Sequence, residues 1–172
     1  MYVYVYVVFM QRLHVSVGGR LARFYDDPAK RALLKPEAQW ECERFAELTG
    51  ADLFAASAVR TSWYGCIVEL FREFDFLALP SAQVFPFPME WTWPRTVAGR
   101  PMDSYHRWME VVAPITLTGC PAISIPVGFG PGPEGRLPMG MQIVGRPRDD
   151  LSVLQLAHAY ERDNPWMAAA RI

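Results

Sequence analysis

Two stretches late in the chain alternate large apolar residues with small or polar ones. In residues 122–127 and 139–144 every second position is apolar: Ile123, Ile125, Val127, Met139, Met141 and Ile143. A period of two is typical of strands that have one face in a core. Residues 128–138 between them are rich in glycine and proline, so the two strands are expected to form a β-hairpin.

Apolar residues spaced by three or four predict two helices. Residues 51–74 carry one such stripe, formed by Ala56, Val59, Trp63, Ile67, Leu70 and Phe74. Residues 149–162 carry a second, formed by Leu151, Leu154, Ala157 and Tyr160. Thr49 and Asp52 have the spacing of a capping box at the start of the first helix. The second helix is expected to cover the apolar face of the hairpin.

Shorter elements separate these segments. Residues 27–34 and 36–48 are expected to be helices. The first begins with Asp27 as a possible cap and Pro28 at the first helical position, and the second begins with Pro36. The apolar run 74–79 ends at a proline and predicts a short buried strand. Residues 103–112 predict a helix, which Pro114 is expected to interrupt.

Two regions fit no regular element of a core. Residues 1–13 begin with alternating Tyr and Val, which predicts an irregular N-terminal strand. Such a strand would need a sheet edge to pair with, so it is doubtful that it belongs to the domain. Residues 81–103 are rich in proline and aromatic residues and predict a long loop. Its rings either cover the edge of a core or line a binding site, and both interpretations remain open.

Helical and strand patterns interleave, which predicts an α/β fold with a mixed sheet covered by helices. A chain of 172 residues with 51% hydrophobic residues suits one globular domain. The net charge of −1, with no basic block, argues against nucleic-acid binding. Cys42, Cys66 and Cys120 are widely separated, which predicts no disulfide framework and no metal site and favours the cytoplasm. The apolar start is too short to span a membrane.

Three motifs follow one another along the chain. They are DFLALP at residues 75–80, LTGCPAISIPVGF at 117–129 and LPMGMQIVGRPRDDLSVLQLAHAYE at 137–161. Because of them, the region from about His14 to Arg162 resembles the C-terminal part of the amidase signature family. The resemblance implies that residues 1–172 form a partial domain of the amidase signature fold, which corresponds to the last part of the family's catalytic domain.

The resemblance also implies a chemistry, the hydrolysis of amide C–N bonds other than peptide bonds. In the family one serine attacks the carbonyl, a second relays a proton to a lysine, and backbone N–H groups stabilise the oxyanion. These groups belong to the family's N-terminal half. This chain has no two adjacent serines, and its only lysines are Lys30 and Lys35, in a segment that resembles a surface region. We therefore assign no catalytic residue to it and expect no cofactor.

The resemblance does imply residues for a substrate pocket. The helix before the second motif contributes pocket residues in the family, and the corresponding positions here are Trp108 and Met109. Such apolar side chains would suit an aryl or alkyl amide better than an amino-acid carboxylate. Trp91 and Trp93 are a second candidate, as a pocket lid. The alternative for all of them is an ordinary place in the core.

Other reactive centres are weaker candidates. His106 and Cys120 could form a base and a nucleophile with Asp103 as the orienting group, but nothing in the sequence fixes their geometry. A small thiol next to a proline is more often a buried packing residue. Ser81 follows a predicted strand as a nucleophile would, yet it lacks the flanking glycines of a nucleophile elbow.

We therefore expect the C-terminal part of an amidase-type hydrolase, which contributes sheet and pocket wall, lacks the Lys-Ser-Ser triad and is inactive alone. A small amide substrate would bind only after an N-terminal half completed the site. The alternative is a non-catalytic, degenerate or repurposed fragment that serves as a structural or interaction module and associates with copies of itself. Neither interpretation involves nucleic acid or a membrane.

Overall fold

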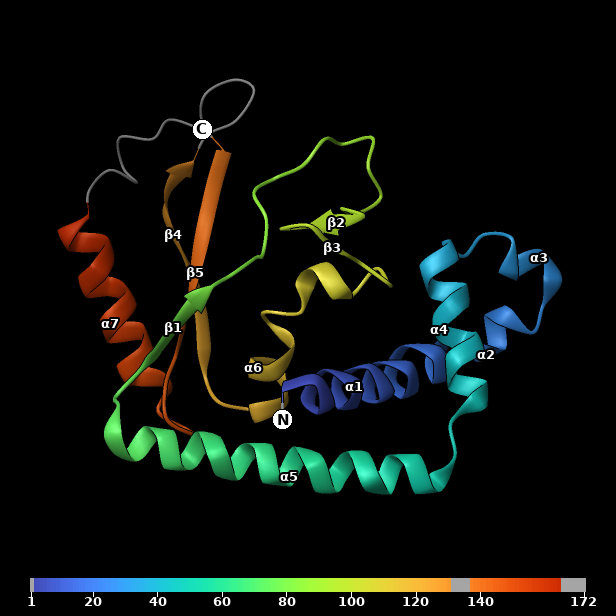
Figure 1. Ribbon diagram of the computed structural model, residues 1–172, viewed down its shortest axis with the longest axis horizontal. Coiled ribbons are helices and arrows are strands. Elements are labelled where there is room, and N and C mark those ends of the chain that lie inside the picture. The colour runs from blue at the N-terminus through green and yellow to red at the C-terminus, as the bar shows by residue number, and fades with distance from the viewer. Residues whose placement is uncertain (1, 131–136, 165–172) are drawn as a thin grey trace. The chain divides into compact units, whose positions relative to one another are not determined.

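The computed structural model describes residues 2–130 and 137–164 (Figure 1). The chain divides into two compact units, Met1–Gly65 and Cys66–Ile172. The expectation of one partial domain over residues 1–172 stays a prediction. In the described part of the chain, no helix combines the length and the apolar character that crossing a membrane requires.

The first unit begins with a helix, so the strand expected within residues 1–13 is wrong. Helix α1 spans Tyr2–Leu13 and runs through a π-helical segment, His14–Gly18, into helix α2, Gly19–Tyr25. An isolated strand would leave its backbone groups unpaired, whereas a helix satisfies them internally. Val5 and Val8 are only 1% and 3% exposed on this helix, so burial outweighs the strand preference of valine.

Two further helices of this unit follow their sequence signals. Helix α3, Pro28–Arg31, is capped by Asp27, whose carboxylate accepts hydrogen bonds from the backbone N–H groups of Ala29 and Lys30. Helix α4, Pro36–Glu47, also begins at a proline, which fits the first turn because no N–H is needed there. Both helices confirm the expected elements.

Helix α5, Gly50–Glu73, carries the chain from the first unit into the second. The expected capping box is confirmed: Thr49 N–H donates to Asp52 Oδ2 at 2.9 Å, and Asp52 N–H donates to Thr49 Oγ1 at 3.2 Å. Ile67 and Phe71 are its most deeply buried side chains after the division between the units. The predicted stripe is therefore right at Ile67 but not at Leu70 or Phe74, which are exposed.

The second unit is built on an antiparallel sheet. Strands β1 (Leu77–Pro80), β5 (Leu137–Val144) and β4 (Ala122–Gly130) lie side by side in that order. Strands β4 and β5 form the expected hairpin, although residues 131–136 of its connection lie outside the described residues. Strand β1 confirms the short strand expected over residues 74–79 but begins later. The expected combination of sheet and helices is confirmed, but both strand pairs in the described part of this sheet are antiparallel, so the sheet is not the mixed one expected.

Helix α7, Asp150–Asp163, covers one face of this sheet and lies beside β4 (Figure 1). Ile125 and Ile143 from the sheet and Ala157 from the helix form the buried centre of the interface. Partly buried side chains surround them: Phe76, Ile123, Val127, Met141, Leu156 and Tyr160. The helix is as expected, but its predicted core face is right only in part: Ala157 and Tyr160 pack on the sheet, whereas Leu151 and Leu154 are 66% and 56% exposed.

The segment between β1 and β4 has little regular structure. It contains the short antiparallel pair β2 (Thr96–Val97) and β3 (Arg100–Pro101), which lies within the expected loop. The helix expected over residues 103–112 is wrong: only a 3₁₀ turn forms there, Arg107–Met109. Helix α6, Ala113–Thr118, follows it. Pro114 lies in the first turn of α6, where a proline is tolerated, and so begins this helix instead of interrupting one.

Candidate functional site

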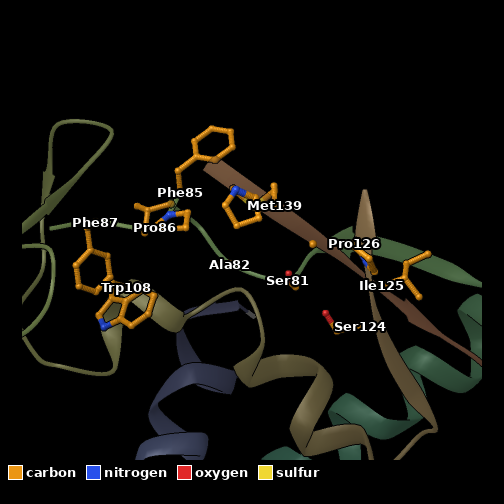
Figure 2. A pocket seen from close by; sticks show the side chains of 13 residues that line it. Ser81, Ala82, Phe85, Pro86, Phe87, Trp108, Ser124, Ile125, Pro126 and Met139 are labelled. Carbon is orange, nitrogen blue, oxygen red and sulfur yellow. The ribbon is translucent and has the colours of Figure 1, made fainter. Parts of the chain in front are cut away.

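The second unit contains a cavity of about 470 Å³ on the β4–β5 hairpin. The loop that follows β1 forms one wall, and the strands of the hairpin form the opposite side (Figure 2). Side chains that line it include Ser81, Phe85, Phe87, Trp108, Ser124 and Met139. A volume of this size suits a small organic molecule. Of the described residues that line the cavity, none is charged.

A buried glutamine ties the cavity wall to the sheet. Gln142 of β5 is 6% exposed, and its Nε2 donates to the carbonyl oxygens of Pro80 at 3.0 Å and Val111 at 3.4 Å. Gln83 accepts a hydrogen bond from the backbone N–H of Val111 at 2.8 Å. The loop after β1 and the segment before α6 are thus held to one another and to β5. Buried amides satisfied in this way fix the position of the backbone around them.

Aromatic rings form the apolar end of the cavity. The rings of Phe87 and Trp108 meet edge to face with centroids 5.4 Å apart, a favoured geometry for aromatic pairs. Trp91 stacks on Phe87 with centroids 6.3 Å apart. Phe87 therefore packs against Trp91 from its own loop and against Trp108 from the 3₁₀ turn.

The predicted pocket residues separate into two groups. Trp108 lines the cavity, whereas Met109, Trp91 and Trp93 are not among its lining residues. Trp93 is 8% exposed and lies under the guanidinium of Arg95, at 3.8 Å from the ring centroid. Whether any of the four contacts a substrate stays a prediction.

The sequence interpretation did not single out Phe85 or Phe87 as cavity residues, and it considered Ser81 only as a nucleophile. The sequence signal for the two phenylalanines is the alternation of phenylalanine and proline at residues 85–88, which indicates an ordered loop that carries aromatic side chains. Ser124 carries no such signal, because it lies within an ordinary alternating strand.

The alternative reactive centre of Asp103, His106 and Cys120 finds little support. Asp103 binds the guanidinium of Arg107, at 2.9 Å and 3.0 Å, and so is engaged with that cation. Cys120 is half-buried, and its backbone N–H donates to Thr118 Oγ1. Among the described residues, no group of three or more His, Cys, Asp and Glu side chains could hold a metal ion.

Hydrogen bonds from Arg107 hold the pKa of the Asp103 carboxyl below its ordinary value, although partial burial acts in the other direction. A lowered folded-state pKa contributes stability above the unfolded value of about 3.9, and this is lost as the pH falls through the folded value. We expect Arg107→Gln to raise the Asp103 pKa toward about 3.9 in a carbon-detected NMR titration. The control is Asp52, whose pKa is lowered by Thr49 and should not change.

Comparison with known proteins gives consistent matches over most of the chain. A family model described as Amidase matches residues 6–154. A glutamyl-tRNA(Gln) amidotransferase subunit from Thermodesulfovibrio yellowstonii is 35% identical over 111 residues, which cover 64% of this chain and 21% of that protein. The fatty acid amide hydrolase of Medicago truncatula is 29% identical over 166 residues, or 91% of this chain and 26% of that protein.

Solved structures show the same fold. A bacterial aryl acylamidase of the amidase signature family matches 100% of this chain with a TM-score of 0.82 and 22% identity, over 37% of its own length. A 6-aminohexanoate cyclic dimer hydrolase matches 94% of this chain with a TM-score of 0.65 and 21% identity, over 35% of its length. The chain thus spans about a fifth to a quarter of the curated relatives and little more than a third of these structures.

Proposed function

This chain belongs to the amidase family, and from that premise we propose that it is the C-terminal portion of an amidase-type hydrolase. In this proposal it supplies the sheet and part of the wall of the substrate pocket, and the catalytic groups come from elsewhere. The observation that supports the proposal most directly is the cavity on the β4–β5 hairpin, whose described lining residues carry no charge and include Phe87 and Trp108, on a chain of this family. An apolar wall of this kind favours an aryl or alkyl amide over a charged substrate.

The catalytic groups that the family uses are not found in this sequence. Amide hydrolysis needs a base that activates the nucleophile, and a lysine fills that role in the family. Of the two lysines, Lys30 pairs with Asp27 at 2.8 Å, and Lys35 directly precedes α4. Neither is among the residues that line the cavity. We therefore propose that the chain alone does not hydrolyse amides.

A hybrid enzyme tests this function. We would replace the matched segment of the bacterial aryl acylamidase with this chain and assay hydrolysis of 4-nitroacetanilide. We expect turnover by the hybrid and none by the 172-residue chain alone. In the hybrid, Trp108→Ala should raise the KM about tenfold, because it removes a large apolar contact worth about 1.4 kcal/mol.

The matched control is Met89→Ala, since Met89 lies in the loop after β1, is 93% exposed and does not line the cavity. Its KM should be unchanged. Amide hydrolysis by the chain alone would contradict the assignment of the catalytic groups to another segment. A hybrid that folds and binds no substrate would contradict the assignment of the pocket wall.

A second candidate function is a non-catalytic interaction module, as the exposed leucines of α7 suggest. Leu154 borders a groove of about 330 Å³ between α7 and β4, which Ile123 and Tyr160 also line. Exposed apolar groups beside a groove are common at protein interfaces. Light scattering of the purified chain separates the two functions: under this candidate, the chain is a well-folded oligomer, and Leu154→Glu shifts it to a smaller species.

A further inference from the structure

Two serine hydroxyls converge at one end of the cavity. Ser81 follows β1, and its backbone N–H donates to the carbonyl oxygen of Gly140 in β5 at 3.0 Å. Ser124 lies in β4 and pairs with Gln142 of β5. A Cβ atom built on Gly140 would collide with Ser81 Oγ and lie 3.2 Å from Ser124 Oγ. The missing side chain at Gly140 therefore leaves the space in which the two hydroxyls meet.

These hydroxyls are available to a ligand. Within residues 2–130 and 137–164, neither Ser81 Oγ nor Ser124 Oγ makes a hydrogen bond to the protein. A serine hydroxyl both donates and accepts. Two of them side by side can therefore donate to a carbonyl oxygen and accept from an N–H group of the same molecule.

Among the described residues, the opposite end of the cavity is formed by aromatic rings. Figure 2 shows the rings of Phe87 and Trp108 at one end and the side chains of Ser81 and Ser124 at the other. No described lining residue could neutralise a carboxylate or an ammonium group, and burying such a charge without a partner is costly. The cavity thus has a polar end, an apolar end and no countercharge among the described residues.

From this arrangement we infer that the cavity binds a neutral ligand with two ends. An aromatic or branched alkyl group lies against Phe87 and Trp108, and an uncharged hydrogen-bonding group, such as an amide, lies at Ser81 and Ser124. Ser81 and Ser124 are specificity residues in this inference, not nucleophiles. The inference rests on the proposed function, since it names the substrate class and the orientation of the substrate in the same pocket.

The cavity is lined by residues of this chain, so the inference departs from the expectation that a small amide binds only after an N-terminal half completes the site. Binding to the full 172-residue chain therefore tests the inference without any catalysis. The probes are acetanilide, which has both ends, ethylbenzene, which lacks the polar group, and benzoate, which is charged. Dissociation constants come from ligand-observed NMR titrations. We expect acetanilide to bind most tightly, and Ser81→Ala and Ser124→Ala each to weaken it about fivefold while ethylbenzene binding does not change.

Matched variants make the result specific. Ser57→Ala removes an exposed hydroxyl on α5, which bonds to the Leu53 carbonyl, and should change no dissociation constant. Ser124→Thr keeps a hydroxyl and should retain the binding of acetanilide. Circular dichroism establishes that each variant is folded. If Ser81→Ala does not fold, the comparison of Ser124→Ala with Ser124→Thr decides.

The outcomes separate this inference from the proposed function. Equal binding of acetanilide by wild type and the doubly substituted Ser81→Ala/Ser124→Ala chain would overturn the inference, as would tighter binding of benzoate or no binding of acetanilide. The turnover of the hybrid enzyme is measured separately, and it tests the proposed function whichever of these results is obtained. A hybrid that hydrolyses 4-nitroacetanilide while the serine variants bind acetanilide normally would refute only the inference.

Discussion

Replacing His14 with leucine is expected to lower the free energy of unfolding by about 3 kcal/mol. His14 Nδ1 lies 2.7 Å from Glu41 Oε2, and the two residues are only 7% and 2% exposed. The rings of His14 and Trp40 also meet in a T-shaped arrangement, with centroids 5.1 Å apart. Leucine keeps the apolar packing but removes the group that bonds to a buried carboxylate, which is then left poorly compensated. Urea unfolding followed by circular dichroism measures the loss.

A double substitution distinguishes a pair effect from a packing effect. In the His14→Leu/Glu41→Met chain both polar groups are gone, and most of the lost stability should return, because apolar groups of similar volume replace the pair. The control is Glu69→Ala, which removes an exposed ion pair with Arg72 and should cost no more than about 0.5 kcal/mol. A double variant as unstable as His14→Leu would mean that the pair itself is not the source of the effect.

The elements that sequence patterns located are those whose stabilising contacts are local. The capping box at Thr49 and Asp52 needs only residues three apart, and the hairpin of β4 and β5 follows from alternation around a glycine-rich connection. Helix α7 likewise follows from its own periodicity. In each case the physical cause lies within one short window of sequence, so the window is sufficient to predict the element.

Helix α1 shows where such a window is not sufficient. Alternating Tyr and Val favours a strand by intrinsic preference, but the deep burial of Val5, Tyr6 and Val8 on a helix outweighs it. Two adjacent glycines at positions 18 and 19 would ordinarily indicate an interruption of regular secondary structure, but they lie inside continuous helical structure. A Cβ on Gly18 would collide with the Glu41 carbonyl and Phe45, so this glycine permits the close approach of α4.

The candidate site was only partly predictable for a similar reason. Its lining comes from stretches around residues 81–87, 108, 124–126 and 138–140, which are separated in the sequence and lie together only in the folded chain. Only the family resemblance predicts Trp108, and the phenylalanines lie in a loop whose sequence is compatible both with covering a core and with lining a site. The His14–Glu41 pair joins residues 27 positions apart, and no local sequence pattern predicts a contact between residues that far apart.

The second large effect is expected at the core of the sheet. Ile143→Ala should lower the free energy of unfolding by about 3 kcal/mol, because Ile143 is 3% exposed and packs with Ile125 and Ala157. Leu151→Ala is the matched control: sequence periodicity assigns this leucine to the core face of α7, but it is 66% exposed and its loss should cost less than about 0.5 kcal/mol. Thermal and urea unfolding of both variants measure the difference.

The contrast between the two substitutions tests the orientation of α7. Both remove several carbon atoms from an aliphatic side chain, so a difference in cost reports burial and not chemistry. A Leu151→Ala chain as destabilised as Ile143→Ala would mean that the side of α7 that carries Leu151, and not the side that carries the buried Val153, packs on the sheet. Equal small effects at both positions would instead mean that the sheet and α7 do not form a tightly packed core, since only a well-packed site makes the loss of a buried isoleucine costly.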